Sequence, residues 1–183
     1  MKGRNGWLGG ENQNEGSRQR ETRWLTPRWI VDSLGRFDLD PCGAPDHALA
    51  DRTYLPERGE DGLSLPWSGR VWLNPPYGKL MAPFIERLSE HGRGTALLFA
   101  RTETNLFFDF IWPTASAVLF LKGRLSFLDA YGVPAAHNSG APSALIAYGE
   151  LDATHLADSG IPGVFVPLQH TVMMRPPTEG IIP

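Results

Sequence analysis

The segment best suited to chemistry is Asn74-Pro75-Pro76-Tyr77, which directly follows an apolar run. An exocyclic aromatic amine is a poor nucleophile, because its lone pair is delocalised into the ring. The side-chain carbonyl of Asn74 and the backbone carbonyl of Pro75 can accept both amine hydrogens and favour a more tetrahedral, reactive nitrogen. The double proline restricts the backbone, and Tyr77 offers a flat face on which a flipped-out base can stack. These four residues therefore predict catalysis at an aromatic amine, with a tight turn under an aromatic lid as the structural alternative.

A second segment of chemical interest is Asp38-Leu39-Asp40-Pro41-Cys42-Gly43. A carboxylate here can hold an ammonium group, and Gly43 lets the backbone approach a ligand closely. S-adenosyl-L-methionine (SAM) carries an ammonium and a sulfonium, so an acidic residue at this place suits it. Helix capping or an exposed carboxylate is an equally good interpretation. The usual glycine-rich dinucleotide and nucleotide-phosphate motifs are both absent from the sequence.

A third candidate ligand contact is Asp61, in the run Asp61-Gly62-Leu63. Its carboxylate can accept a hydrogen bond from the adenine amine of SAM. An exposed loop is nearly as good an interpretation of the same residues. No Cys/His cluster has the spacing of a zinc site, so we expect no metal.

The elements that must position these residues are short apolar strands alternating with helices. Strand-like runs fall at residues 37–40, 71–74, 95–100, 117–121 and 143–148, with 163–168 as an edge strand. Helical spacing falls at 79–91 and 103–112, and a shorter helix has Thr26 as N-cap, Pro27 at its first position and Gly35 at its end. Runs such as 95–100 are apolar throughout, as in strands buried on both faces. The alternation predicts an α/β fold, a doubly wound and mostly parallel sheet, with ligands at the carboxyl ends of its strands.

Length and composition favour one domain. The chain has 183 residues, of which 42% are hydrophobic. We expect a flexible N-terminal tail over 1–20, a single domain over 21–170 and a loose tail over 171–183. No apolar run is long enough to span a membrane and no secretory leader is visible, and the one cysteine suits a reducing compartment. These features predict a soluble cytoplasmic protein.

The net charge of −3 disfavours binding to nucleic acid through bulk electrostatics. The charges are unevenly distributed, however, because residues 37–66 hold two basic and seven acidic side chains, while 1–36 and 70–128 each hold seven basic and four acidic ones. This pattern suits an acidic pocket for a cationic ligand with a mildly basic face elsewhere.

Five short stretches occur in an order that resembles the phage and prophage DNA N6-adenine methyltransferase family, the small phage-type Dam group. They are 24–27 (WLTP), 37–42 (FDLDPC), 61–63 with Trp67, 71–78 (VWLNPPYG) and 140–144 (GAPSA). The resemblance covers about residues 24–150. It implies a Rossmann-like class I SAM-dependent methyltransferase that acts on DNA in a bacterial or phage-infected cell. The loop 42–45 (CGAP) departs from the F-x-G-x-G of larger DNA methylases.

The resemblance also implies roles for single residues. Asn74 to Tyr77 would form the amine-binding catalytic motif. The cofactor-binding positions would be Asp40, Pro41 and Gly43 around the methionine part of SAM, Thr26 and Pro27 in an adjoining segment, and Asp61 near the cofactor adenine.

No separate target-recognition domain fits in this length, so site selection must come from short segments. The candidates for DNA contact are Arg101, Lys122, Arg124 and the loop 129–141 with His137 and Asn138. Lys and Arg at these places can each contact a phosphate, which would make affinity salt-dependent. An exposed basic turn is an equally good interpretation.

Several alternatives stay open at this point. The same four-residue motif also serves methylases of RNA adenine, of cytosine N4 and of protein glutamine, and a non-catalytic DNA-binding protein can share the scaffold. The pair Pro41-Cys42 invites comparison with cytosine-5 methylases, which attack through a cysteine after a proline. That comparison is weak, because the pair lies where the cofactor should bind. The target sequence, and whether the protein is a monomer or a dimer, are not determined by the sequence.

Overall fold

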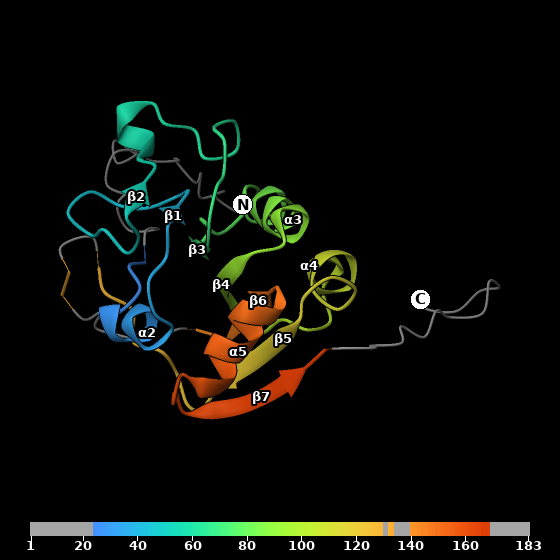
Figure 1. The fold of residues 1–183 in the computed structure, drawn as a ribbon. Coiled ribbons are helices and arrows are strands. Elements are labelled where there is room, and N and C mark those ends of the chain that lie inside the picture. Colours follow the sequence, from blue (N-terminus) through green and yellow to red (C-terminus); the bar gives the residue numbers. More distant parts are fainter. Residues whose placement is uncertain (1–23, 130–131, 134–139, 169–183) are drawn as a thin grey trace, which may run out of the picture.

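A computed structural model describes residues 24–129, 132–133 and 140–168, and these residues form one seven-stranded sheet (Figure 1). The strands are β1 (Leu39–Asp40), β2 (Arg52–Thr53), β3 (Val71–Leu73), β4 (Gly94–Phe99), β5 (Ala117–Leu121), β6 (Ser143–Tyr148) and β7 (Gly163–Pro167), in the order β2-β1-β3-β4-β6-β5-β7. β2, β1, β3 and β4 pair in parallel. β6 is antiparallel to β4 and β5, and β7 is antiparallel to β5. Strands β1 to β5 therefore share one direction, and their carboxyl ends lie at one edge of the sheet.

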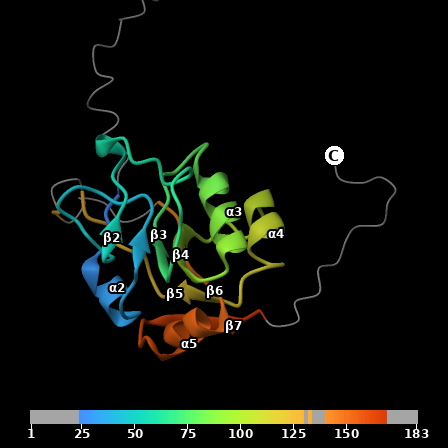
Figure 2. The same ribbon diagram turned by 45° about the horizontal axis from the view of Figure 1, so that its top comes forward.

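Helices cover both faces of this sheet. They are α2 (Arg28–Ser33), α3 (Met81–His91), α4 (Asn105–Phe110) and α5 (Glu150–Asp158), with a short 3-10 helix η1 (Pro56–Arg58) between β2 and β3. α3 and α4 lie side by side on one face, and α2 and α5 pack on the other (Figures 1 and 2). Within β3, Val71 and Leu73 pack toward α3 and Trp72 packs toward α2, and all three are fully buried. Strands that are apolar on both faces require helices on both faces, which the structure confirms.

The predicted α/β fold and most of its elements are confirmed. Strands β5 and β6 have the predicted bounds, and the other predicted strands agree to within two residues. The prediction of a mostly parallel sheet holds for the pairings among β1 to β4, whereas the reversed directions of β6 and β7 were not predicted. Strand β2 and helix α5 were also missed. The buried face of α5 contains a charged residue, Asp152, beside Leu156, so the helix lacks a clear apolar stripe.

The start of α2 corrects one prediction. Pro27 occupies the N-cap position and no side chain caps the helix, so the assignments of Thr26 as N-cap and of Pro27 as the first helical residue are both wrong by one position. The physical reason is that the Thr26 hydroxyl accepts a hydrogen bond from the side chain of Asn74 instead, at 3.2 Å. The predicted end at Gly35 is confirmed by its left-handed backbone, with φ of 81°, which glycine adopts without strain.

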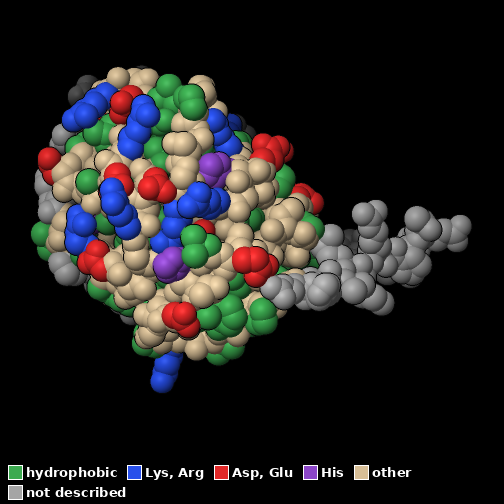
Figure 3. All heavy atoms as spheres, viewed as in Figure 1, with side chains coloured by type: hydrophobic (Ala, Val, Ile, Leu, Met, Phe, Trp, Pro, Cys, Tyr) green, Lys and Arg blue, Asp and Glu red, His purple; other side chains and the backbone are tan. Residues whose placement is uncertain are grey.

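The surface carries no single-sign patch on the face drawn in Figure 3, where basic and acidic side chains are interspersed. None of the helices in the described part of the chain combines the length and the hydropathy needed to cross a membrane.

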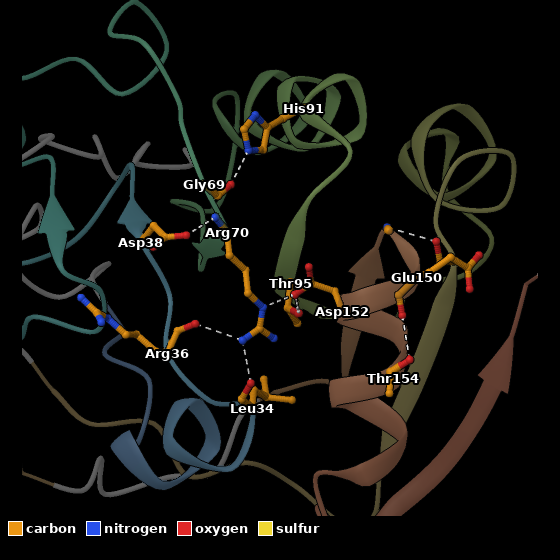
Figure 4. Close-up of polar contacts among 12 residues, drawn as sticks. Leu34, Arg36, Asp38, Gly69, Arg70, His91, Thr95, Glu150, Asp152 and Thr154 are labelled. Carbon is orange, nitrogen blue, oxygen red and sulfur yellow. Dashed lines mark hydrogen bonds and ion pairs between the residues drawn. The ribbon is translucent and has the colours of Figure 1, made fainter.

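A buried ion pair lies at the amino end of β3, on the edge opposite to Asn74. Arg70 is 4% exposed and Asp152 is fully buried. The Arg70 Nε donates to Asp152 Oδ1 at 2.7 Å, and its Nη1 donates to the carbonyls of Leu34 at 2.7 Å and Arg36 at 3.1 Å. Thr95 of β4 donates to the same Asp152 oxygen at 3.1 Å (Figure 4). The ion pair thus joins the end of α2 and β3 through Arg70, and α5 and β4 through Asp152.

Removing one partner of this pair should be strongly destabilising. Asp152→Ala leaves the Arg70 charge buried without its carboxylate, so the free energy of unfolding should fall by about 3–5 kcal/mol. Urea unfolding measures the change. Asp51→Ala is the matched control, because Asp51 pairs with Arg36 at the surface and solvent screens that pair. Equal losses in the two variants would contradict the central role given to Arg70.

Candidate active site

Asn74 directly follows β3, and its side-chain amide is held by the segment before α2. Its Nδ2 donates to the backbone carbonyl of Trp24 at 2.8 Å and to the Thr26 hydroxyl at 3.2 Å. A backbone carbonyl only accepts hydrogen bonds, so the amide nitrogen must face Trp24. Among the described residues no donor contacts Asn74 Oδ1, which is left as an acceptor for another molecule.

The segment after β1 lies against Asn74. The Cys42 thiol donates to the backbone carbonyl of Asn74 at 3.3 Å, and the Cys42 N–H donates to Asp40 Oδ1 at 3.1 Å. Asp40 is 4% exposed, although it is a carboxylate. Because β1 and β3 are parallel neighbours, their carboxyl ends bring the two predicted segments together.

The Asp40 segment packs tightly against the end of β2 at Gly43. A Cβ on Gly43 would lie 2.2 Å from the Thr53 side-chain methyl and 3.0 Å from Asp40 Oδ2. Glycine is therefore required here for packing within the protein. The Thr53 hydroxyl is buried, and no described residue hydrogen-bonds to it.

Asp61 shapes the turn that precedes β3. Its carboxylate accepts from the Leu63 N–H at 3.0 Å and from the Ser64 hydroxyl. These bonds, first the one from Ser64 and then the one from Leu63, lower the pKa of Asp61 below its ordinary value. The side chain is exposed and ionised at neutral pH, so it can still accept a further hydrogen bond from a ligand.

The turn that contains Asp61 packs against the Asp40 segment and is hydrogen-bonded by Arg87 of α3. A Cβ on Gly62 would lie 1.8 Å from the Pro41 carbonyl oxygen, so the two backbones are in direct contact. Arg87 of α3 donates to the carbonyls of residues 62, 63 and 65. Its guanidinium also lies 5.0 Å from the centre of the Trp67 ring, whose Nε1 donates to Gly62 at 2.7 Å. The Asp61 turn is therefore fixed against the segment that contains Asp40 and Pro41.

A cavity of about 480 Å³ opens beside Tyr77, between the segments that follow β3 and β4. Its lining includes the aromatic residues Trp24, Tyr77, Phe99 and Phe107, and Arg101 is the one charged residue among the described residues that line it. The Tyr77 ring stacks on Phe99 with centroids 4.5 Å apart and 28° between the planes. The cavity suits a flat, largely apolar ligand attached to an anion.

The Tyr77 hydroxyl is buried, and no described residue hydrogen-bonds to it. Burial raises the pKa of Tyr77 well above its ordinary value, although the nearby Arg101 charge opposes the shift. The ring therefore stays neutral at every pH at which the protein would work.

A comparison with protein-family models matches residues 13–156 to the DNA N-6-adenine-methyltransferase (Dam) family. The chain belongs to this family. The match confirms the resemblance expected from the sequence, and it includes every element from α2 to most of α5. A comparison of this Dam family member with curated proteins found no match.

The structure brings most of the predicted site residues of this Dam family member to one edge of the sheet. Those that lie together around the ends of β1 and β3 are Thr26, Pro27, Asp40, Pro41, Gly43, Asp61, Asn74, Pro75, Pro76 and Tyr77. Arg101 lines the cavity. Lys122 and Arg124 are exposed just after β5, whose carboxyl end lies at the same edge. His137 and Asn138 lie outside the described residues.

Three residues that shape the site were missed from the sequence. Phe99 stacks on Tyr77, Arg87 clamps the Asp61 turn, and His47 donates from Nε2 to the Thr26 carbonyl at 2.9 Å. Arg87 and His47 bind backbone carbonyls, and such bonds leave no mark in the sequence of the partner. Phe99 ends an apolar strand, and its contact with Tyr77 depends on how the segment after β3 folds over the end of β4.

His47 should make the free energy of unfolding depend on pH. Burial lowers the pKa of His47 below its ordinary value of 6.5; Arg28 adds to this, and the bond to Thr26 opposes it. The unfolded chain then takes up the proton at a higher pH than the folded chain. The free energy of unfolding should therefore fall as the pH drops below about 6.5.

Urea unfolding between about pH 7.5 and about pH 5.5 measures this loss. His47→Gln keeps an N–H donor but does not titrate, so its stability should fall less over the same range. Identical pH dependence in the two proteins would show that His47 is not the group responsible.

Proposed function

We propose that this chain transfers a methyl group from SAM to the N6 amine of an adenine that is flipped out of DNA. The observation that carries the proposal is the fixed amide of Asn74. Its nitrogen is held by Trp24 and Thr26, which leaves its oxygen as an acceptor, and both Trp24 and the nearby Tyr77 line an aromatic cavity. Family membership favours adenine in DNA over RNA adenine, cytosine N4 or protein glutamine. We also infer the class I methyltransferase fold from the family and the sheet.

Residues at the carboxyl ends of β1 and β2 have side chains that suit SAM. Asp40 places a carboxylate at the carboxyl end of β1, and a carboxylate is complementary to the ammonium and sulfonium charges of SAM. The Thr53 hydroxyl, buried and without a partner among the described residues, is available to a polar group of a ligand. We propose that Asp40, Pro41 and Gly43 hold the methionine part, with Thr26 and Pro27 beside it and Asp61 near the adenine. When bound, SAM would supply an electrophilic methyl group from its sulfonium, whose S–CH3 bond breaks to leave the neutral thioether S-adenosylhomocysteine.

The chain itself would contribute positioning and electrostatics. Asn74 Oδ1 and the Pro75 carbonyl accept the two hydrogens of the target amine and favour the tetrahedral nitrogen that can form the new N–C bond. The methylated nitrogen then loses one proton to water. No side chain has to change its protonation state, and much of the rate enhancement comes from alignment.

The cavity would take the flipped base. An adenine ring can stack on Tyr77, whose raised pKa keeps it neutral, and Arg101 at the same cavity can pair with a phosphate of the flipped nucleotide. We propose that Lys122 and Arg124, with His137 and Asn138 of the loop 129–141, contact the flanking DNA. Such a protein would work in the cytoplasm of a bacterial or phage-infected cell.

The catalytic assignment is tested by Asn74→Ala. Loss of a preorganised acceptor should lower kcat by about 100- to 1000-fold, while the Kd for SAM stays within about twofold. Transfer of labelled methyl groups to DNA and calorimetric titration with SAM measure the two quantities. Asn105→Ala, at the exposed start of α4, is the matched control and should change neither. Wild-type kcat in Asn74→Ala would show that the site is misassigned.

The cofactor assignment is tested by Gly62→Ala. The added methyl cannot fit against the Pro41 carbonyl, so the Asp61 turn must move away from the Asp40 segment. The Kd for SAM should rise by about tenfold or more, because the ligand loses contacts on one side. Gly59→Ala is the control: it strains a left-handed glycine in the same connection, yet its Cβ meets no atom within 4 Å. Equal effects of the two changes on the Kd would count against the assignment.

A further inference from the structure

We infer that Thr26 is a positioning residue for methyl transfer, because its hydroxyl and the Trp24 carbonyl together set the orientation of the Asn74 amide. The inference rests on the proposed function. It gives Thr26 a role toward Asn74 that differs from the cofactor contact expected of its segment. The catalytic group stays Asn74, and Thr26 acts through it.

Both hydrogens of the Asn74 amide nitrogen have acceptors, at 2.8 Å in Trp24 and 3.2 Å in Thr26. An asparagine amide without such partners can turn over and exchange its oxygen with its nitrogen. Turned over, Asn74 would present an NH2 group to the NH2 group of the substrate, and two donors cannot bond each other. Correct orientation is therefore a condition for activating the amine.

Thr26 is itself held in place. Thr26 is 1% exposed, so water does not compete with Asn74 for a hydrogen bond to its hydroxyl. Its carbonyl accepts from the His47 ring at 2.9 Å. On its other side, Leu25 and Leu128 exchange two backbone hydrogen bonds of 2.9 Å each. The segment 24–27 thus links Leu128, which follows β5, to Asn74, which follows β3, through hydrogen bonds.

The decisive comparison is between Thr26→Val and Thr26→Ser. Valine keeps the shape but removes the acceptor, so kcat should fall by about 10- to 100-fold with KM for DNA and Kd for SAM within about twofold. Serine keeps the hydroxyl and should restore kcat to within about threefold of wild type. Thr95→Val is the matched control, since it removes a buried threonine hydroxyl at the opposite edge of the sheet. It should lower stability without lowering kcat.

A second readout follows the amide directly. The side-chain NH2 signals of Asn74 in a 15N-resolved NMR spectrum, assigned with Asn74→Ala, should shift in Thr26→Val and not in Thr95→Val. Wild-type kcat in Thr26→Val would overturn the inference, as would unmoved Asn74 signals. A raised Kd for SAM with unchanged kcat would also overturn it and make Thr26 a cofactor contact. A wild-type protein that transfers no methyl group would refute the proposed function, while the NMR result would still decide whether Thr26 orients Asn74.

Discussion

The buried ion pair of Arg70 and Asp152 is the interaction on which the rest of the structure depends. A charge inside a protein is costly unless its partner is present, so α5 and the end of α2 must stay where Arg70 can reach them. Arg70 immediately precedes β3 and Asn74 immediately follows it, and the three residues between them are fully buried. Whatever fixes Arg70 therefore also fixes the start of the candidate active site.

At the other end of β3 the site is built from backbone carbonyls, an amide and hydroxyl groups, set close to one buried carboxylate, Asp40. The bond from the Cys42 thiol to the backbone carbonyl of Asn74, and the contact of Gly62 with Pro41, join three chain segments. Such a site presents fixed dipoles to a ligand, and reorganisation during the reaction costs little. This is the arrangement that an amine substrate needs, because the amine must be oriented and polarised more than deprotonated.

The sequence predicted those features that depend only on neighbouring residues in the chain. Strand β5 is apolar throughout and β6 is apolar after its first residue, and Asn74 and Asp40 were singled out because they lie at strand ends. These predictions needed no partner in space. The missed features depend on pairs far apart in the sequence. Thr26 looked like a helix cap, yet its hydroxyl bonds a residue 48 positions away. Helix α5 is held by Asp152, whose partner Arg70 lies 82 positions away, and neither residue shows that relation by its type.

The central claim, adenine methylation of DNA, is tested most directly by the product. Unmethylated DNA is incubated with the protein and SAM carrying a tritiated methyl group, then digested to nucleosides and separated. The account predicts that the label elutes with N6-methyladenosine in its deoxy form. Label on cytosine would contradict the choice of base, and no label on DNA, with SAM binding demonstrated, would contradict the proposed activity.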